Sequence, residues 1–140
     1  MNDQSIEQEI QAKGLTAPRI NPADLQANIE SEHYFTAHDG VLGAYRNGGD
    51  VHPVGGTPSV RTGSSLDLLT FCVLVLRNGF TVTGESACAS PENFDAETGR
   101  KIARANAEQK IWPLMGYELK ERLFQHSLSG QGVAGPSAAE

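Results

Sequence analysis

Two arginines and an Asn/Asp pair form the strongest candidate for a ligand-binding site in this sequence. Arg100 and Arg104 are four positions apart, so a helix would carry both guanidinium groups on one face. Guanidinium groups on a rigid helix suit the capture of phosphate or pyrophosphate oxygens. Asn93 and Asp95 stand near the start of the same helix, where such side chains can contact ribose hydroxyls or a base edge. Phe80 offers a ring on which a base could stack.

The same residues also have purely structural explanations, which the sequence leaves open. Arg104 can pair with Glu108 one helical turn away. Asn93 and Asp95 can simply cap the helix, and Phe80 can fill the core beneath a turn. Arg100, Arg104, Asn93, Asp95 and Phe80 are therefore predicted ligand-binding residues with helix capping and packing as the alternative.

Catalysis and metal binding have weaker support. Cys88 is a possible nucleophile, yet no local context pairs it with any of the four histidines, at positions 33, 38, 52 and 126. A small cysteine is more often buried in packing. No Cys-x-x-Cys or His-Glu-x-x-His motif occurs. We expect no catalytic residue, no metal site and no cofactor.

Composition restricts the class of partner. The chain has 140 residues, a net charge of -6 and a pI near 5.2, which argues against direct binding to DNA. Two cysteines make no disulfide framework, and no signal peptide is recognisable, so a reducing cytoplasm is expected. The longest apolar run, residues 68–76, is too short to cross a bilayer as a helix. A chain of this size has a limited core, so we expect a homo-oligomer to contribute stability.

A β-hairpin is the clearest predicted element. Residues 68–76 are apolar at nearly every position, which predicts a strand buried on both faces. Asn78-Gly79 follows, and this pair favours a type I′ turn. The second strand, residues 80–85, alternates between Phe80, Val82 and Gly84 on one side and polar residues on the other.

The predicted helices carry apolar residues at helical spacing after a capping residue. They span residues 5–14, 22–33 and 90–112, with a further short helix after a break at Pro113; residues 33–37 are expected to form a short strand. Residues 40–65 are rich in Gly, Pro, Ser and Asn and predict a loop. We therefore expect an α+β fold, a single small domain with an antiparallel β-hairpin or sheet packed with N- and C-terminal helices. Its parts are a helical segment at 1–18, a core at 19–125 with a flexible loop at 46–65, and a disordered tail at 126–140.

Several long segments resemble the gene-49-like family of small tailed-phage and prophage proteins. The resemblance covers most of the chain and is carried by "NGFTVTGESAC", "PENFD" and "KIWPLMGY", with "IEQEIQAKGLTAPRI" and "SEHYFTAHDGVLGA" upstream. It implies a phage-encoded, intracellular accessory protein. The family is also similar to the phage anti-Thoeris sponge proteins, which are small α+β oligomers that bind a cyclic ADP-ribose isomer without cleaving it, in pockets near subunit contacts.

That second resemblance implies roles for the candidate residues. Arg100 and Arg104 would take the phosphates, Asn93 and Asp95 the ribose or base edges, and Phe80 the adenine face. The leading hypothesis is a non-enzymatic counter-defence protein in the host cytoplasm that sequesters a cyclic ADP-ribose isomer or another cyclic nucleotide. The alternative is a phage accessory protein that binds and inhibits a host protein. A third hypothesis is an enzyme that acts on a nucleotide.

Overall fold

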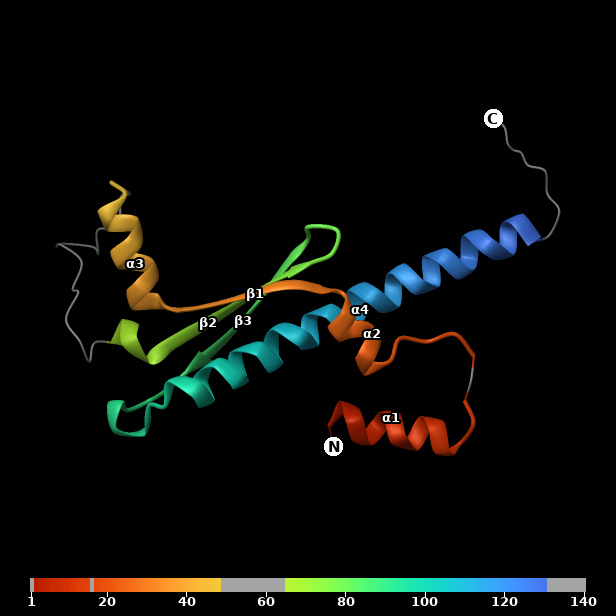
Figure 1. The fold of residues 1–140 in the computed structure, drawn as a ribbon, viewed down its shortest axis with the longest axis horizontal. Coiled ribbons are helices and arrows are strands. Elements are labelled where there is room, and N and C mark those ends of the chain that lie inside the picture. The colour runs from red at the N-terminus through yellow and green to blue at the C-terminus, as the bar shows by residue number, and fades with distance from the viewer. Residues whose placement is uncertain (1, 16, 49–64, 131–140) are drawn as a thin grey trace. The chain divides into compact units, whose positions relative to one another are not determined.

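The computed structural model describes residues 2–15, 17–48 and 65–130, which form an α+β fold around one antiparallel sheet (Figure 1). This confirms the predicted fold class. The elements follow one another as α1 (Asp3–Ala12), α2 (Pro22–Ala27), β1 (Ile29–Thr36), α3 (Ala37–Arg46), a 3-10 turn (Ser65–Leu68), β2 (Leu69–Leu76), β3 (Thr81–Ala87), a second 3-10 turn (Pro91–Asn93) and α4 (Ala96–Gly130).

Contacts divide the chain into two units. One comprises residues 1–27 and 111–140, and the other comprises residues 28–110. In the first, Asn2 caps α1 by accepting a hydrogen bond from the Ser5 amide (2.8 Å). In this unit Arg19 forms a bidentate ion pair with the buried Glu7 (Nη2–Oε2 2.8 Å). This pair joins α1 to the segment that precedes α2, as expected for a helix too short to be stable alone.

The sheet occupies the second unit and has the order β1-β2-β3, with both pairs antiparallel. The predicted hairpin is confirmed, but its turn differs from type I′. The Gly79 amide donates to the Leu76 carbonyl (2.8 Å), so Arg77 and Asn78 are the central residues. Gly79 follows at φ +91°, the left-handed position that closes a three-residue hairpin loop.

Residues 96–110 of α4 lie along one face of the sheet. On β2 the side chains of alternate residues, Thr70, Cys72, Leu74 and Leu76, are buried, whereas the intervening residues are only half-buried. The prediction that this strand is buried on both faces is therefore wrong for the described residues. The closest approach is at Gly84 of β3, where a Cβ atom would lie 2.1 Å from the Ala103 carbonyl oxygen. The helix can rest there because Gly84 has no side chain.

The region around β1 corrects two sequence predictions. The helix predicted for residues 22–33 ends at Ala27, because from Ile29 onward the backbone pairs with β2. Residues 40–46 are helical and belong to α3, not to a loop. The reason is a capping box, in which the Thr36 hydroxyl accepts from the Asp39 amide (3.1 Å) and Asp39 accepts from the Thr36 amide (3.0 Å). Most of the predicted loop at 46–65, namely residues 49–64, lies outside the described residues.

Helix α4 is longer than predicted. It passes through Pro113 without ending, although proline removes one backbone hydrogen bond. The residues before it are held in place, because Ile111 is fully buried and the Trp112 indole donates to Asp3 (3.2 Å). The helix continues to Gly130, so the predicted disorder is wrong for residues 126–130, and residues 131–140 lie outside the described part.

Candidate functional site

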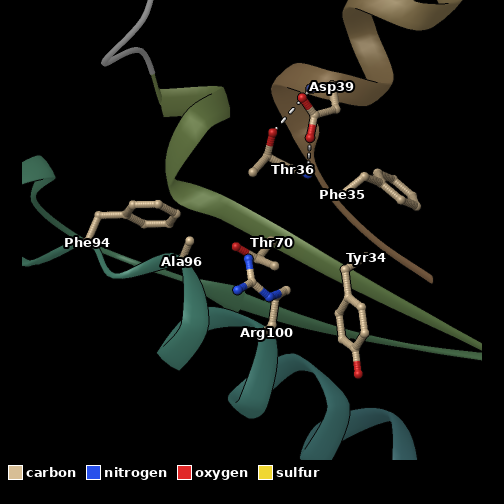
Figure 2. Close-up of a pocket in the computed structure, with 8 residues that line it drawn as sticks. All are labelled: Tyr34, Phe35, Thr36, Asp39, Thr70, Phe94, Ala96 and Arg100. Atoms are coloured by element: carbon tan, nitrogen blue, oxygen red, sulfur yellow. Dashed lines mark hydrogen bonds between the residues drawn. The ribbon is translucent and has the colours of Figure 1, made fainter. Parts of the chain in front are cut away.

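A small pocket of about 110 Å³ opens beside Arg100, where the end of β1 meets the start of α4. Its walls come from the consecutive elements β1 and α3, from β2, from Phe94 and from the start of α4, all within the second unit (Figure 2). The lining residues are Tyr34, Phe35, Thr36, Asp39, Thr70, Phe94, Ala96 and Arg100. The lining thus combines three aromatic residues, two threonines, one carboxylate and one guanidinium group.

Local structure explains why these residues converge. The capping box at Thr36 turns the chain from β1 into α3 and brings Asp39 to the pocket. Thr36 also pairs with Thr70 across the sheet, so both hydroxyl side chains belong to adjacent strands. Asp95 starts α4, which places Ala96 at its first position and Arg100 one turn later.

Arg100 is the group in this pocket that is most available to a ligand. Its side chain is exposed, and within the described ranges it forms no hydrogen bond or ion pair with another residue. Figure 2 shows its guanidinium group directed toward Thr70, between Phe94 and Tyr34. Asp95 attracts Arg100 at longer range, yet the oxygen Oδ2 of that carboxylate is engaged by Thr98. An unpaired guanidinium group among rings and hydroxyls is suited to hold one phosphate group.

Arg104 has a different role from the one predicted for it. Its Nη1 lies 2.7 Å from Glu32 Oε2, and its Nε lies 2.9 Å from Glu108 Oε2. The Tyr34 hydroxyl accepts a hydrogen bond from the same guanidinium group and donates one to Glu32 Oε1 (2.7 Å). These partners raise the pKa of Arg104 well above its usual value, although burial opposes the shift. Arg104 therefore fastens α4 to β1, and it is not free to bind a phosphate in this arrangement.

Asp95 and Asn93 are also engaged locally. Asp95 Oδ2 accepts hydrogen bonds from the Thr98 amide (2.9 Å) and the Thr98 hydroxyl (2.6 Å), and these lower the pKa of the carboxyl group. Asp95 thus caps α4, which is the alternative to ligand binding that the sequence left open for this residue. Asn93 is exposed and its amide nitrogen lies 3.4 Å from the Ser90 hydroxyl. Both residues lie on the segment that leads into α4, and neither lines the pocket.

Phe80 is far from the other predicted site residues. It follows the hairpin turn, where its carbonyl pairs with Leu76, while the pocket lies at the other end of β2, beside Thr70. Its ring is 55% exposed, so it does not fill the core either. The aromatic residues that line the pocket are Tyr34, Phe35 and Phe94, none of which was predicted, and the Phe35 ring is directed away from Arg100 (Figure 2). The position of Phe94 could have been inferred from the sequence, because Phe94 directly precedes Asp95, the residue that caps the helix carrying Arg100.

Both cysteines are engaged in packing or in a local hydrogen bond. Cys72 is fully buried, and burial raises the pKa of its thiol. The Cys88 thiol donates to the Ser90 carbonyl (3.1 Å). Across the described ranges no three His, Cys, Asp or Glu side chains cluster closely enough to hold a metal ion. No helix among those residues is long and apolar enough to cross a membrane.

The role of Arg104 gives a stability prediction. Arg104→Met is expected to lower the free energy of unfolding by about 1–2 kcal/mol, because it removes the ion-pair partner of Glu32 and of Glu108, of which only Glu108 is substantially buried. Chemical denaturation followed by circular dichroism measures the change. Arg122→Met is the matched control, since both members of its i,i+4 pair with Glu118 are exposed, and it should cost no more than about 0.5 kcal/mol. Equal losses for the two variants would refute the fastening role.

Comparison with known proteins identifies a family. The model of a family described as phage protein (N4 Gp49/phage Sf6 gene 66) matches residues 20–123, a range that includes the whole pocket. No curated protein and no solved structure matches the chain significantly.

Proposed function

The chain belongs to the phage protein (N4 Gp49/phage Sf6 gene 66) family, and from this premise we propose that it is a counter-defence protein that binds and sequesters a cyclic nucleotide signal without cleaving it. The proposed ligand is a cyclic ADP-ribose isomer or a related cyclic nucleotide in the host cytoplasm. The observation that carries the proposal is Arg100, which forms no hydrogen bond or ion pair with the described residues, in a pocket of aromatic and hydroxyl side chains.

The chemistry of the pocket supports a phosphate-bearing ligand. Arg100 would donate to phosphate oxygens, and the Thr36 and Thr70 side chains could contact the phosphate or a ribose. Phe94 offers a ring at the same rim, where a base could stack. Sequestration requires affinity alone, so the proposal needs no nucleophile and no metal ion.

The size of the pocket determines how such a ligand would bind. A volume of about 110 Å³ is well below the roughly 300 Å³ at which sites for whole small molecules begin. The pocket would therefore hold one phosphate or one sugar of the nucleotide, and the remainder would lie on the surface around Arg100. Asp39 lines the same pocket, and its carboxylate disfavours a second phosphate close by.

Isothermal titration calorimetry tests this function directly. We expect at least one member of a panel of cyclic ADP-ribose isomers and cyclic di- and trinucleotides to bind with a Kd below about 10 μM. Chromatography of the ligand after incubation should recover it intact. Absence of binding across the panel would refute sequestration, and a cleaved ligand would point to an enzyme.

A second candidate function, inhibition of a host protein, is favoured by the exposed apolar side chains on the C-terminal part of α4. Tyr117 is 74% exposed and Phe124 is 50% exposed, and Leu128 continues the same stripe. Side chains of this kind are common at protein-protein contacts. This function predicts no nucleotide binding in the calorimetric panel, together with a host partner whose capture is lost in Tyr117→Ser.

A further inference from the structure

The face of the sheet opposite α4 carries a row of apolar side chains on its central strand. These residues are Leu69, Phe71, Val73 and Val75, and we refer to the surface they form as the open face. All four remain half-exposed, whereas the alternate residues of β2 are buried against the other side. A strand that is apolar on both sides normally belongs to a sheet covered on both faces.

The two edge strands surround this row with polar groups. Residues paired across the sheet share a face, so His33 of β1 and Thr83 of β3 flank Val73. In the same way, Phe35 and Glu85 flank Phe71. The Phe35 ring stacks on Phe71 with centroids 5.5 Å apart and remains 37% exposed, and it points away from Arg100 (Figure 2). An apolar centre with a polar rim is the usual composition of a protein interface.

The dimensions of the open face suit a second sheet of the same size. Three strands about 4.8 Å apart and about 26 Å long outline nearly 400 Å², so two such faces together would bury roughly 800 Å². This area is typical of a weak interface, which dissociates on dilution. A second copy of this chain provides a sheet with identical dimensions and an identical apolar centre.

The charges at the rim also fit a second copy. If the two-fold axis runs parallel to the strands, β1 of one copy lies over β3 of the other. His33 then comes level with Thr83 of the second copy and stands next to its Glu85. The symmetry repeats this contact, so the His33 side chain of each copy lies next to the Glu85 carboxylate of the other.

We propose that the open face is a homodimer interface in which two copies pack sheet against sheet. The proposal is independent of the proposed ligand, because Arg100 and the side chains of the open face lie on different faces of the sheet. It also accounts for the apolar side chains that β2 carries on the face opposite α4.

Sedimentation velocity tests the interface. The wild-type chain should sediment as a dimer at about 100 μM and dissociate on dilution into the low micromolar range. Val73→Glu, which introduces a charge at the centre of the face, should weaken the dimer at least tenfold. The matched control is Ile102→Glu, at an exposed apolar position on α4 (47% exposed), which should leave dimerisation unchanged. Circular dichroism verifies folding, and Thr83→Arg on the exposed edge strand provides a second disrupting variant.

A charge swap identifies the occupant as a second copy. His33→Glu places a carboxylate next to Glu85 of the other copy and should weaken the dimer several-fold. Adding Glu85→Lys to the same chain should restore the dimer, because the carboxylate at position 33 of each copy then lies next to the lysine at position 85 of the other. A wild-type monomer at 100 μM, or a Val73→Glu chain that dimerises normally, would overturn the proposal. In that case a different protein would be the occupant of the open face.

Discussion

Replacing Gly84 with alanine is expected to lower the free energy of unfolding by at least about 3 kcal/mol. The new Cβ atom would lie 2.1 Å from the Ala103 carbonyl oxygen and 2.4 Å from the Ala107 amide nitrogen. Both obstacles are backbone atoms of α4, which cannot turn aside as a flexible side chain could. The helix must therefore shift away from β3, and this shift loosens the packing of Val82, Leu74 and Cys72, which are buried beneath it.

Chemical denaturation measures this loss, and the chain provides a matched control. Gly116 lies within the same helix, and a Cβ atom built there meets no other atom within 4 Å. Gly116→Ala should therefore stabilise the protein, by about 0.5–1 kcal/mol, through helix propensity. A Gly84→Ala chain within about 1 kcal/mol of wild type would show that α4 does not rest on β3 at this residue.

Arg100→Ala should weaken binding of the nucleotide identified by calorimetry by about 10- to 100-fold. A hydrogen bond to a charged group contributes about 1.5–3 kcal/mol, and Arg100 is the guanidinium group that lines the pocket. The stability of the fold should barely change, because the Arg100 side chain is exposed and forms no ion pair with the described residues.

Two controls separate binding from folding. Arg122→Ala removes an exposed arginine that lies on α4 outside the pocket, and it should leave the affinity unchanged. Arg100→Lys keeps the charge but loses the planar pair of donors, so its affinity should fall between those of the wild type and the alanine variant. If Arg100→Ala binds as tightly as wild type, the phosphate site lies elsewhere.

The sequence sufficed for those parts of the fold that depend on local patterns. The apolar run at 68–76 and the Asn-Gly pair predicted the hairpin, and Asp95, one of the capping residues that the sequence offered, caps α4 through the Thr98 amide. Helix α3 was missed because Gly40 and Gly43 suggest a loop, although Thr36 and Asp39 form a capping box that the sequence displays. The passage of α4 through Pro113 depends on tertiary contacts of its neighbours, which no local pattern reveals.

The candidate site was predicted only in part, for a similar reason. Helical spacing correctly placed Arg100 and Arg104 one turn apart, but it could not distinguish their environments. Arg104 is paired with Glu32, a residue 72 positions earlier, and only the pairing of β1 with β2 brings the two together. The pocket residues Tyr34 and Thr70 were missed because they come from those same strands.

The most direct test of the proposed function is a crystal structure of the chain with the tightest-binding member of the nucleotide panel. We predict electron density for a phosphate group within hydrogen-bond distance of the Arg100 guanidinium group, with the Arg104 pairs to Glu32 and Glu108 intact. Density for the nucleotide at a site that does not include Arg100 would contradict the account.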